Sequence, residues 1–521
     1  ATFVAGGVLL LSGTLPLPAG RTIWLSRFVS MEALAVSHFL GSLVGVALLF
    51  LGRALQQRLD AGYWCAATLL AAGCALSVLR GGGPFEFGTL AAVLLTLIPC
   101  RKQFYRKASF WQERFTLGWI AAVTVVLLGT VWLGLFCYRH TAYADDLWWR
   151  FGFDANAPRF LRASLGAVTL AVVVALAKLV KTAPVAAVPL TPENLAAAEE
   201  IVRRSPRVFA WLALLGDKQL LFNNTNTAFI MYGMRGRSWI ALNEPVGPEG
   251  ERKELAWRFR ELCDRNGVRP AFYQVRPESL PLFLELGLSL LKLGEEGRVR
   301  LASFGLEGSS RRNLRHDVSR AEKGGCRFEL VPVESIPDLL PDFERISNAW
   351  LAAKNTREKG FSLGFFREDY LLRFPAAVVR VNGVPVAFAN VLVGANKAEL
   401  SVDLMRHLPD CPPGMMTYLF TQLMLWGKRE GFDWFGLGTA PLSGLEDRAL
   451  SSLWNRFGAR VYHHGEHFYG FEGLRQFKDK FGPVWEPRYL ASKGGMALPR
   501  TLTDLVALIS GEAPDATDTV V

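Results

Sequence analysis

The sequence predicts a multi-span α-helical membrane domain followed by an α/β cytosolic region, and three observations lead to this prediction. Only 20% of the 521 residues are charged, and nearly all of the charge deficit lies before residue 185; soluble domains usually carry about 25% charged residues. Six apolar segments occur in that first part. After it, strand and helix patterns alternate in two successive rounds, which is typical of α/β domains.

The apolar segments are candidate membrane spans. A span needs about 20 apolar residues, and the second, third and fifth segments reach this length. The fourth segment is short, so we expect it to be tilted or re-entrant. The segments are 1–17, 33–52, 61–79, 86–99, 115–138 and 160–178. We therefore expect about six transmembrane helices within residues 1–182.

The loop 101–114, between the fourth and fifth segments, sets the expected orientation. Its sequence, RKQFYRKASFWQER, is rich in lysine and arginine, and basic loops face the cytoplasm. The region after the sixth segment is then cytoplasmic as well. Since Ala1 already lies in an apolar run, a signal peptide does not fit, and we expect a chain cut from a longer polytopic protein.

Charge and cysteine usage narrow the partners and the compartment. The net charge of +11 indicates an anionic partner, either nucleic acid or an anionic membrane surface. The seven cysteines are widely spaced and form no C-x-x-C pair. This pattern argues against a disulfide framework or a structural zinc site, so we expect the second part of the chain to be cytosolic.

A Pro/Ala linker, 183–190, joins the two parts. Thr191 opens the sequence T-P-E-N, which is typical of a capped helix with proline in its first turn. A hairpin and a helix ended by Gly267 follow. In the second round, Asn382-Gly383 forms the expected tight turn between two strands. The expected domains are 191–324 and 325–500, followed by a C-terminal tail, 501–521.

The stretch ELSVDLMRHLPDCPPGMMTYLF begins as a strand at residue 399. Leu400, Val402 and Leu404 alternate with more polar positions, which predicts one apolar face and an opposite face that carries Asp403. Arg406 follows, and a proline-rich turn then leads into a helix. The residues alone allow two interpretations of Asp403 and Arg406: a structural ion pair, or charges placed for function.

The segment 309–325, SSRRNLRHDVSRAEKGG, predicts a basic helix. Arg312, Arg315, Ser319 and Lys323 recur three to four residues apart and therefore share one face. A solvated surface helix has this pattern, and so does a stripe that follows a phosphate backbone. No base-reading motif is present, so a nucleic acid would be contacted through its backbone or shape.

The sequence offers little support for metal, nucleotide or hydrolase chemistry. HHGEH, 463–467, has an inverted zinc-peptidase spacing, but that chemistry requires a helix, and Gly465 and strand-like flanks argue against one. No G-x-S-x-G elbow occurs, and Ser443 is expected in a turn or in ligand binding. Phosphate-binding loops are absent from the sequence as well. We expect neither a metal nor a cofactor.

Seven motifs carry a resemblance to a known family: REKGFSLGFF, AFAN, ELSVDLMRHLPDCPPGMMTYLF, FGLGTAPLSGL, LWNRFG, HHGEHFYGFEGLRQFKDKF and WEPRYLA. Together they resemble the synthase domain of bacterial aminoacyl-phosphatidylglycerol synthases. The best-known members are the phosphatidylglycerol lysyltransferases, also called multiple peptide resistance factors. The resemblance extends from about residue 205 to 491. It implies two tandem acetyltransferase-like (GNAT) folds, the second of them catalytic.

The resemblance also implies a reaction and a setting. An aminoacyl group, most simply lysyl, is transferred from aminoacyl-tRNA to a glycerol hydroxyl of phosphatidylglycerol. The product lipid is less anionic, which implies resistance to cationic antimicrobial peptides. The implied location is the bacterial cytoplasmic membrane, as a multi-pass protein with a cytoplasmic synthase domain. Its implied partners are aminoacyl-tRNA, phosphatidylglycerol and the bilayer, and a homo-oligomer is a further expectation.

Three alternatives stay open. Thr417 and Thr439 stand where the family pattern has Asp and Met beside the expected pocket, so alanyl transfer is an alternative to lysyl transfer. A tRNA-dependent peptidoglycan aminoacyltransferase shares the donor and the basic helix, although the membrane spans favour a lipid acceptor. A lipid flippase with a non-catalytic cytosolic domain is the third alternative, and it predicts activity without aminoacyl-tRNA.

The implied transesterification defines the candidate site. It needs an anion for the ammonium group of the amino acid, cations for the lipid phosphate or the tRNA terminus, and a group that moves a proton. Acetyl-CoA is disfavoured as donor, because the turn after the strand lacks the glycines of a pyrophosphate-binding loop. The candidate catalytic residues are Asp403 and Arg406 (from the motif DLMR), His464 and Glu466 (proton transfer or ammonium binding) and Lys478 (phosphate or oxyanion). The candidate substrate-binding residues are Lys480, Ser443, Arg312, Arg315 and Lys323.

Overall fold

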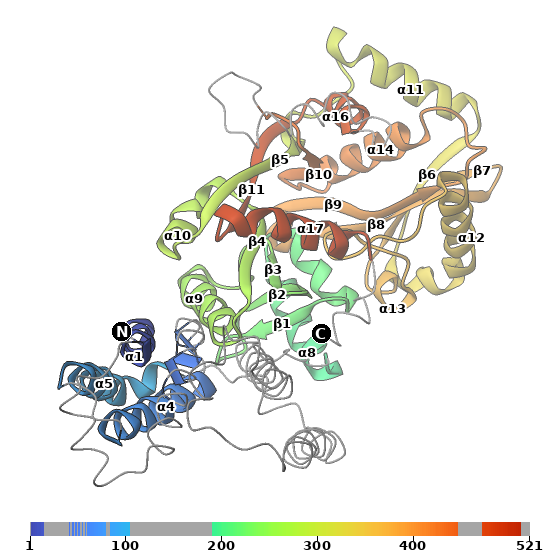
Figure 1. The fold of residues 1–521 in the computed structure, drawn as a ribbon. Coiled ribbons are helices and arrows are strands. Elements are labelled where there is room, and N and C mark those ends of the chain that lie inside the picture. Colours follow the sequence, from blue (N-terminus) through green and yellow to red (C-terminus); the bar gives the residue numbers. More distant parts are fainter. Residues whose placement is uncertain are drawn as a thin grey trace, which may run out of the picture. The chain divides into compact units, whose positions relative to one another are not determined.

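The computed structural model describes residues 2–14, 60–79, 84–104, 190–445 and 471–511, with scattered positions between 41 and 58 (Figure 1). Two compact units divide the chain. One holds residues 1–185 together with 265–267, and the other holds residues 186–264 and 268–521.

The first unit contains packed apolar helices. They are α1 (Thr2–Thr14), α4 (Asp60–Leu79) and α5 (Pro84–Leu97), followed by the 3-10 turn η1 (Ile98–Gln103). Leu9, Leu70 and Leu90 are fully buried between them. The helices coincide with the first, third and fourth predicted spans.

Two described stretches are long and apolar enough to cross a membrane, Asp60–Val78 and Pro84–Arg101. The fifth and sixth predicted spans, 115–138 and 160–178, lie outside the described residues. The six-span membrane domain therefore stays a prediction.

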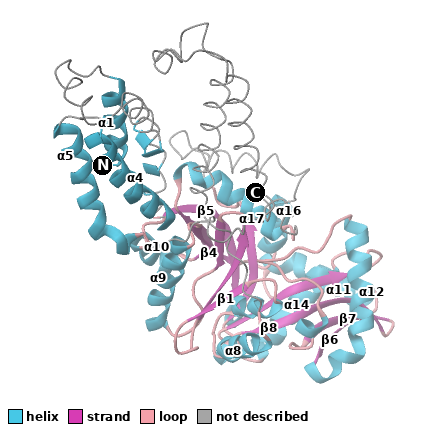
Figure 2. Cartoon of the chain, turned by 60° about the horizontal axis from the view of Figure 1, so that its bottom comes forward, coloured by secondary structure: helices cyan, strands magenta, loops and turns pink. Residues whose placement is uncertain are grey.

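The second unit is built on an 11-stranded sheet with the order β1-β2-β3-β4-β11-β5-β10-β9-β8-β7-β6. Figure 2 draws the strands of this sheet in magenta. The strands are β1 (Gln219–Phe222), β2 (Phe229–Arg235), β3 (Ser238–Leu242), β4 (Arg269–Val275), β5 (Ser289–Arg300), β6 (Cys326–Val331), β7 (Ala376–Val381), β8 (Val384–Val393), β9 (Glu399–His407), β10 (Trp434–Pro441) and β11 (Val484–Ser492).

The sheet consists of two similar halves that exchange a strand. Among the described pairs, β3–β4 and β9–β10 are parallel, and the others are antiparallel. The last strand of the first half, β5, pairs with β10 of the second half, while β11 of the second half pairs with β4 of the first. The two halves thus complete one another's sheet and do not form separate sheets, and the two tandem acetyltransferase-like domains stay a prediction.

Helices cover both faces of the sheet. In the first half, α9 and α10 pack on one face through Phe259, Phe272 and Phe283, and η4, α8 and α17 pack on the other. In the second half, α12 packs on one face, where Phe343 stacks on Phe388 at 4.2 Å, and α11 and α14 pack on the other. Figure 1 shows α17 crossing the sheet and α11, α14 and α16 close together.

The helical elements of this unit are α8 (Pro192–Arg203), η4 (Val208–Leu215), α9 (Glu249–Arg265), η5 (Pro277–Ser279), α10 (Leu280–Glu285), η6 (Leu301–Ser303), η7 (Ser309–Arg311), α11 (Arg312–Lys323), η8 (Val333–Ser335), α12 (Ile336–Lys354), α13 (Glu368–Leu371), η9 (Ala395–Lys397), α14 (Met415–Arg429), α16 (Phe471–Asp479), η10 (Gly495–Ala497) and α17 (Leu498–Ile509).

Local signals predicted several boundaries correctly. The Thr191 side chain accepts a hydrogen bond from the backbone N–H of Asn194 at 3.3 Å and caps α8. The Asn382-Gly383 turn joins β7 and β8, and both residues have positive φ, 50° and 84°. Two-residue hairpin turns of this type favour Asn-Gly because both positions are left-handed.

The predicted alternation along β9 is wrong at Leu404. Leu400 and Val402 pack in the core beneath α14, as expected for one apolar face. Leu404 instead packs with Phe343 and Phe388 on the α12 side. The physical reason is a β-bulge within β9, which interrupts the two-residue period.

Part of the expected C-terminal tail is a packed helix. Residues 498–509 form α17, whose Leu502, Leu505 and Leu508 contact the core of the first half. Asp504 accepts hydrogen bonds from Ser238 and from Arg269 at 2.5 and 3.1 Å, which ties α17 to β3 and β4.

Candidate active site

β9 and β10 open into a wedge. They are paired in parallel where Glu399–Ser401 faces Trp434–Gly436, and the Ser401 hydroxyl donates to the Gly436 carbonyl at 2.8 Å. Within the described part of the chain, no hydrogen bond joins residues 402–407 to residues 437–441 beyond this point. The two parallel strands therefore separate at their carboxyl ends, and we call this region the wedge.

In the first half, the corresponding parallel strands, β3 and β4, stay joined by hydrogen bonds beyond the end of β3. Just beyond β3, the N–H of Asn243 donates to the carbonyl of Tyr273 at 2.7 Å. The buried Glu244 accepts hydrogen bonds from the backbone N–H and the Nε of Arg276, at 2.8 and 3.3 Å. Of these two parallel pairs, β9 and β10 in the second half are the ones that separate.

A β-bulge in the wedge directs two charged side chains to one face. Asp403 and Leu404 together oppose Asn390 of β8. Both of their backbone N–H groups donate to the Asn390 side-chain oxygen, at 3.3 and 2.8 Å. Because the bulge adds one residue to the alternation, Asp403 and Arg406 leave β9 on the same side, toward α12 and α13.

Asp403 is held by two neutral donors. Its carboxylate accepts hydrogen bonds from the N–H of Gly364 at 2.8 Å and from the hydroxyl of the fully buried Tyr370 at 3.0 Å. Burial raises the pKa of Asp403, while these hydrogen bonds and the charge of Lys218 lower it. A Cβ at Gly364 would lie 2.0 Å from the Asp403 Oδ2 atom, so this close approach requires glycine.

Arg406 has partners of its own. Its Nη2 lies 2.8 Å from the Glu358 carboxylate, and its guanidinium lies 4.1 Å from the ring centroid of Trp350. Burial lowers the pKa of Arg406, and the negative charge of Glu358 raises it. Arg406 thus pairs with Glu358, and the structural ion pair with Asp403 is not the arrangement present.

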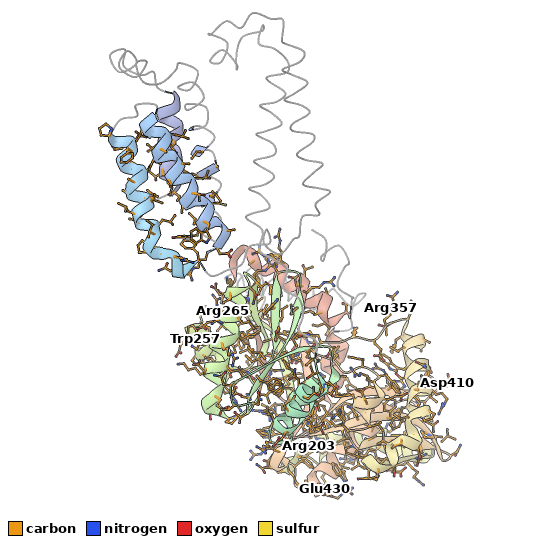
Figure 3. The ribbon with its side chains drawn as sticks, turned by 90° about the horizontal axis from the view of Figure 1, so that it is seen from below. Arg203, Trp257, Arg265, Arg357, Asp410 and Glu430 are labelled. Carbon is orange, nitrogen blue, oxygen red and sulfur yellow. The ribbon has the colours of Figure 1, made fainter. Side chains whose placement is uncertain are left out.

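The segment 358–366 lies between Asp403 and a pocket of about 400 Å³. The segment is bonded on both sides, because the N–H of Phe361 donates to Asp217 at 2.7 Å and that of Gly364 donates to Asp403. Figure 3 labels Arg357, which precedes this segment, and Asp410, which follows β9, on the same side of the unit. The pocket lining includes Asp217, Glu358, Tyr232, Phe361, Phe365 and Leu508.

Lys478 approaches the wedge from the opposite face. It is buried on α16, and its ammonium donates to the carbonyls of Gly438 and Thr439 in β10, at 3.0 and 2.9 Å. Burial lowers its pKa to about 8, opposed by the charge of Glu296. The structure therefore separates Lys478 from Asp403 and Arg406 by the sheet.

The basic helix α11 is present, and its charges divide into two groups. Arg315 donates to the carbonyls of Leu306 and Gly308 and so holds the preceding loop. Arg312 and Lys323 are exposed. Lys480 lies 3.9 Å from Asp317 of this helix, so the structure places Lys480 beside the basic helix.

The other predicted site residues are less informative. Ser443 is buried, and its hydroxyl donates to the Ala440 carbonyl at 2.8 Å within a turn. His464 and Glu466 lie outside the described residues. Within the described ranges, no group of three or more His, Cys, Asp or Glu side chains is arranged to hold a metal ion.

Sequence reasoning missed most of the partners around Asp403. Glu358 and Gly364 lie in the motif REKGFSLGFF, so the motif itself could have pointed to them. Tyr370 and Lys218 gave no signal, because a single polar residue in an apolar neighbourhood has no periodic pattern.

Relatives of known sequence match the whole second unit. Residues 199–492 match the family described as phosphatidylglycerol lysyltransferase, C-terminal. The chain is 31% identical over 527 residues to the phosphatidylglycerol lysyltransferase of Bacillus subtilis (strain 168), covering 99% of this chain and 59% of that protein. It is 32% identical over 318 residues to the enzyme of the same name from Staphylococcus aureus (strain MRSA252), covering 61% of this chain and 38% of that protein. The chain thus spans less than two thirds of the length of these relatives.

Two solved structures share the fold of the second unit. One is the C-terminal DUF2156 domain of a protein from Agrobacterium fabrum that carries the name lysylphosphatidylglycerol synthetase. It has 43% identity and a TM-score of 0.57, and the match covers 62% of this chain and 98% of that one. The other is L-PGS from Bacillus licheniformis, with 34% identity and a TM-score of 0.55, covering 63% and 99%.

The second unit is thus one sheet of two similar halves that exchange a strand, the fold that it shares with these two structures. The chain belongs to the phosphatidylglycerol lysyltransferase family, through the C-terminal region of that family.

Proposed function

We propose that this chain transfers a lysyl group from lysyl-tRNA to a glycerol hydroxyl of phosphatidylglycerol. The observation that carries the proposal is the placement of Asp403 and Arg406 on one face of β9, where β9 separates from β10. Membership of the phosphatidylglycerol lysyltransferase family supports the acceptor.

The reaction needs no external activation. The glycerol oxygen attacks the ester carbonyl carbon of the aminoacyl-tRNA and forms a new C–O bond. The bond between that carbon and the tRNA ribose oxygen breaks, and the ribose oxygen takes the proton that the glycerol hydroxyl gives up. In this account, Asp403 attracts the ammonium group of the amino acid, and Arg406 attracts phosphate; preorganised charges of this kind stabilise transition states.

The proposal of a lysyl group rests on family membership and not on the charge of the pocket. Asp217 and Glu358 bring carboxylates to the pocket wall, but each already pairs with a cation, Lys218 and Arg406. Arg235 and Lys359 also line the pocket. Tyr232, Phe361 and Phe365 add aromatic faces, which attract ammonium groups.

A lipid acceptor is supported by the first unit, where Asp60–Val78 and Pro84–Arg101 have the length and composition of membrane spans. A tRNA donor is supported by the exposed Arg312 and Lys323 on α11 and by the neighbouring Lys480. Positive charges at helical spacing match a phosphate backbone.

A transfer assay with two donors and two acceptors tests the proposal. The chain, in phosphatidylglycerol vesicles, receives tRNA charged with labelled lysine or labelled alanine, without ATP. We expect labelled lipid from lysyl-tRNA at a higher rate than from alanyl-tRNA, and none in vesicles of phosphatidylethanolamine alone. Equal or greater transfer from alanyl-tRNA would favour the alanyl alternative. Labelled lipid formed from free lysine and ATP would contradict the tRNA donor.

A further inference from the structure

Behind Asp403 lies a buried lysine to which no role is assigned. The Lys218 side chain is 0% exposed, and its ammonium lies 2.5 Å from the Asp217 carboxylate. Burying an ammonium group is unfavourable unless an anion compensates it. A lysine retained at this depth is therefore placed by specific contacts.

The local sequence brings Lys218 to the boundary between the halves. The apolar turn η4 ends at Gly216, whose φ of 75° reverses the chain before β1. Arg367 of the second half donates to the Leu215 carbonyl at 2.5 Å, which fixes the reversal. Lys218 thus belongs to the first half but sits against residues of the second.

Two carboxylates from different halves hold the same segment. Asp217 accepts a hydrogen bond from the N–H of Phe361 at 2.7 Å, and Asp403 accepts one from the N–H of Gly364 at 2.8 Å. Lys218 pairs directly with Asp217. Burial lowers the pKa of the Lys218 ammonium, and the charges of Asp217 and Asp403 raise it.

We propose that Lys218 is a positioning residue for the transfer reaction: its buried ammonium fixes Asp217, and the Asp217 carboxylate holds segment 358–366 against Asp403. This inference rests on the proposed function. It gives the first half a direct part in shaping the site of the second half. In the first half itself, β3 and β4 stay joined by a hydrogen bond at the corresponding position.

The charged and titratable groups around Asp403 determine the direction of the effect. They are Asp217 and Lys218 before β1, Tyr370 on α13 and Arg406 on β9. Burial and the charge of Asp217 raise the pKa of Asp403, and the charge of Lys218 lowers it. Removing the ammonium therefore favours the protonated acid, and removing Asp217 as well offsets part of that change.

The test compares Lys218→Met, the double variant Asp217→Asn/Lys218→Met and a control, Lys397→Met, in the whole chain. Lys397 is an exposed lysine paired with Glu430 at 3.7 Å. Two quantities are measured: hydrogen exchange of segment 358–366 without substrate, and the pH profile of kcat/KM for lysyl transfer.

We expect Lys218→Met to increase exchange at Phe361 and Gly364 and to reduce transfer by about 10²-fold at neutral pH, as a misplaced catalytic group does. The acidic limb of its profile moves to higher pH, and the double variant moves it part of the way back. Lys397→Met matches the wild type in both measurements.

Unchanged exchange in Lys218→Met overturns the proposal, even if the wild-type chain transfers nothing and the proposed function itself fails. Faster hydrogen exchange in segment 358–366, with the acidic limb of the kcat/KM profile unchanged, would give Lys218 a structural role only. That result also overturns the proposal. If Lys218→Met does not fold, the double variant, which buries no unpaired carboxylate at position 217, gives the same two readouts.

Discussion

Asp403 and Arg406 leave β9 on the same face but bind different partners: Asp403 accepts hydrogen bonds from Gly364 and Tyr370, and Arg406 pairs with Glu358. Each charge is thus held by its own partners, on the side of β9 that faces α12 and α13. The predictions below follow from this arrangement.

Asp403→Asn removes the anion and keeps the shape of the side chain. We expect transfer to fall by about 10²–10³-fold, as for other preorganised electrostatic groups, while the protein stays folded. Initial rates and a melting curve measure the two effects. Asp410→Asn, an exposed position after β9, is the control and should retain the wild-type rate; near-normal transfer by Asp403→Asn would show that its charge is not used.

Arg406→Lys keeps the charge but loses the planar group that stacks on Trp350 and pairs with Glu358. We expect Arg406→Lys to recover little of the activity lost in Arg406→Met, since guanidinium and ammonium differ in geometry. Steady-state rates at saturating tRNA with varied phosphatidylglycerol measure the effect. Full activity of the lysine variant would mean that charge alone is sufficient at this position.

Gly364→Ala places a methyl group on the Asp403 carboxylate. The Cβ would lie 2.0 Å from Oδ2, so either the segment or the carboxylate must move. We expect a loss of about 1–3 kcal/mol in the free energy of unfolding, as for other overpacked sites, together with reduced transfer. Urea unfolding of this variant and of Gly305→Ala, where an added Cβ meets nothing within 4 Å, provides the comparison.

The lowered pKa of Lys478 predicts that the transfer rate falls on the alkaline side of its pH profile. Its folded-state pKa is lowered from 10.5 to about 8, so the ammonium loses its charge as pH rises through about 8. If transfer depends on that charge, the rate falls over this interval in the wild type. Lys478→Met should be slow at every pH and should lack this fall. The rates are measured as initial rates, with the remaining charged tRNA determined at each pH; a wild-type rate that is flat from pH 7 to 9 would remove Lys478 from the mechanism.

The exposed face of α11 predicts a salt-dependent interaction with tRNA. Arg315 is excluded from this test because it supports the loop before α11. We expect Arg312→Ala/Lys323→Ala to raise the KM for lysyl-tRNA and to reduce the salt slope of tRNA binding by about 0.7–0.9 for each tRNA phosphate that is no longer neutralised. Arg203→Ala/Lys253→Ala, on α8 and α9, is the control. Unchanged tRNA binding with weaker binding to anionic vesicles would assign this face to the membrane.

Much of the fold could be predicted from local signals. The Thr191 cap and the Asn382-Gly383 turn each depend on a few adjacent residues, and both are confirmed. The exchange of β5 and β11 could not be predicted, because strand partners far apart in sequence leave no periodic trace. The same limit explains the error at Leu404, where the bulge depends on the side chain of Asn390 in the neighbouring strand.

The candidate site also has a part that the sequence predicted and a part that it did not. Asp403 and Arg406 came from one short motif, and the structure places them on one face. Their partners come from four other segments, including Lys218 and Tyr370, which are buried by tertiary packing alone. Motifs therefore pointed to the charges, but only the folded chain shows what holds each charge.

The central claim is that Asp403 supports transfer of a lysyl group from tRNA to phosphatidylglycerol. A single-turnover experiment tests it most directly: excess chain in phosphatidylglycerol vesicles is mixed with lysyl-tRNA labelled in the amino acid, and the lipid fraction is followed over time. The account predicts that the label enters lipid as the tRNA is discharged, and that Asp403→Asn binds the same tRNA but slows this step by about 10²-fold or more. Discharge of lysine to water without labelled lipid, or equal transfer by Asp403→Asn, would contradict it.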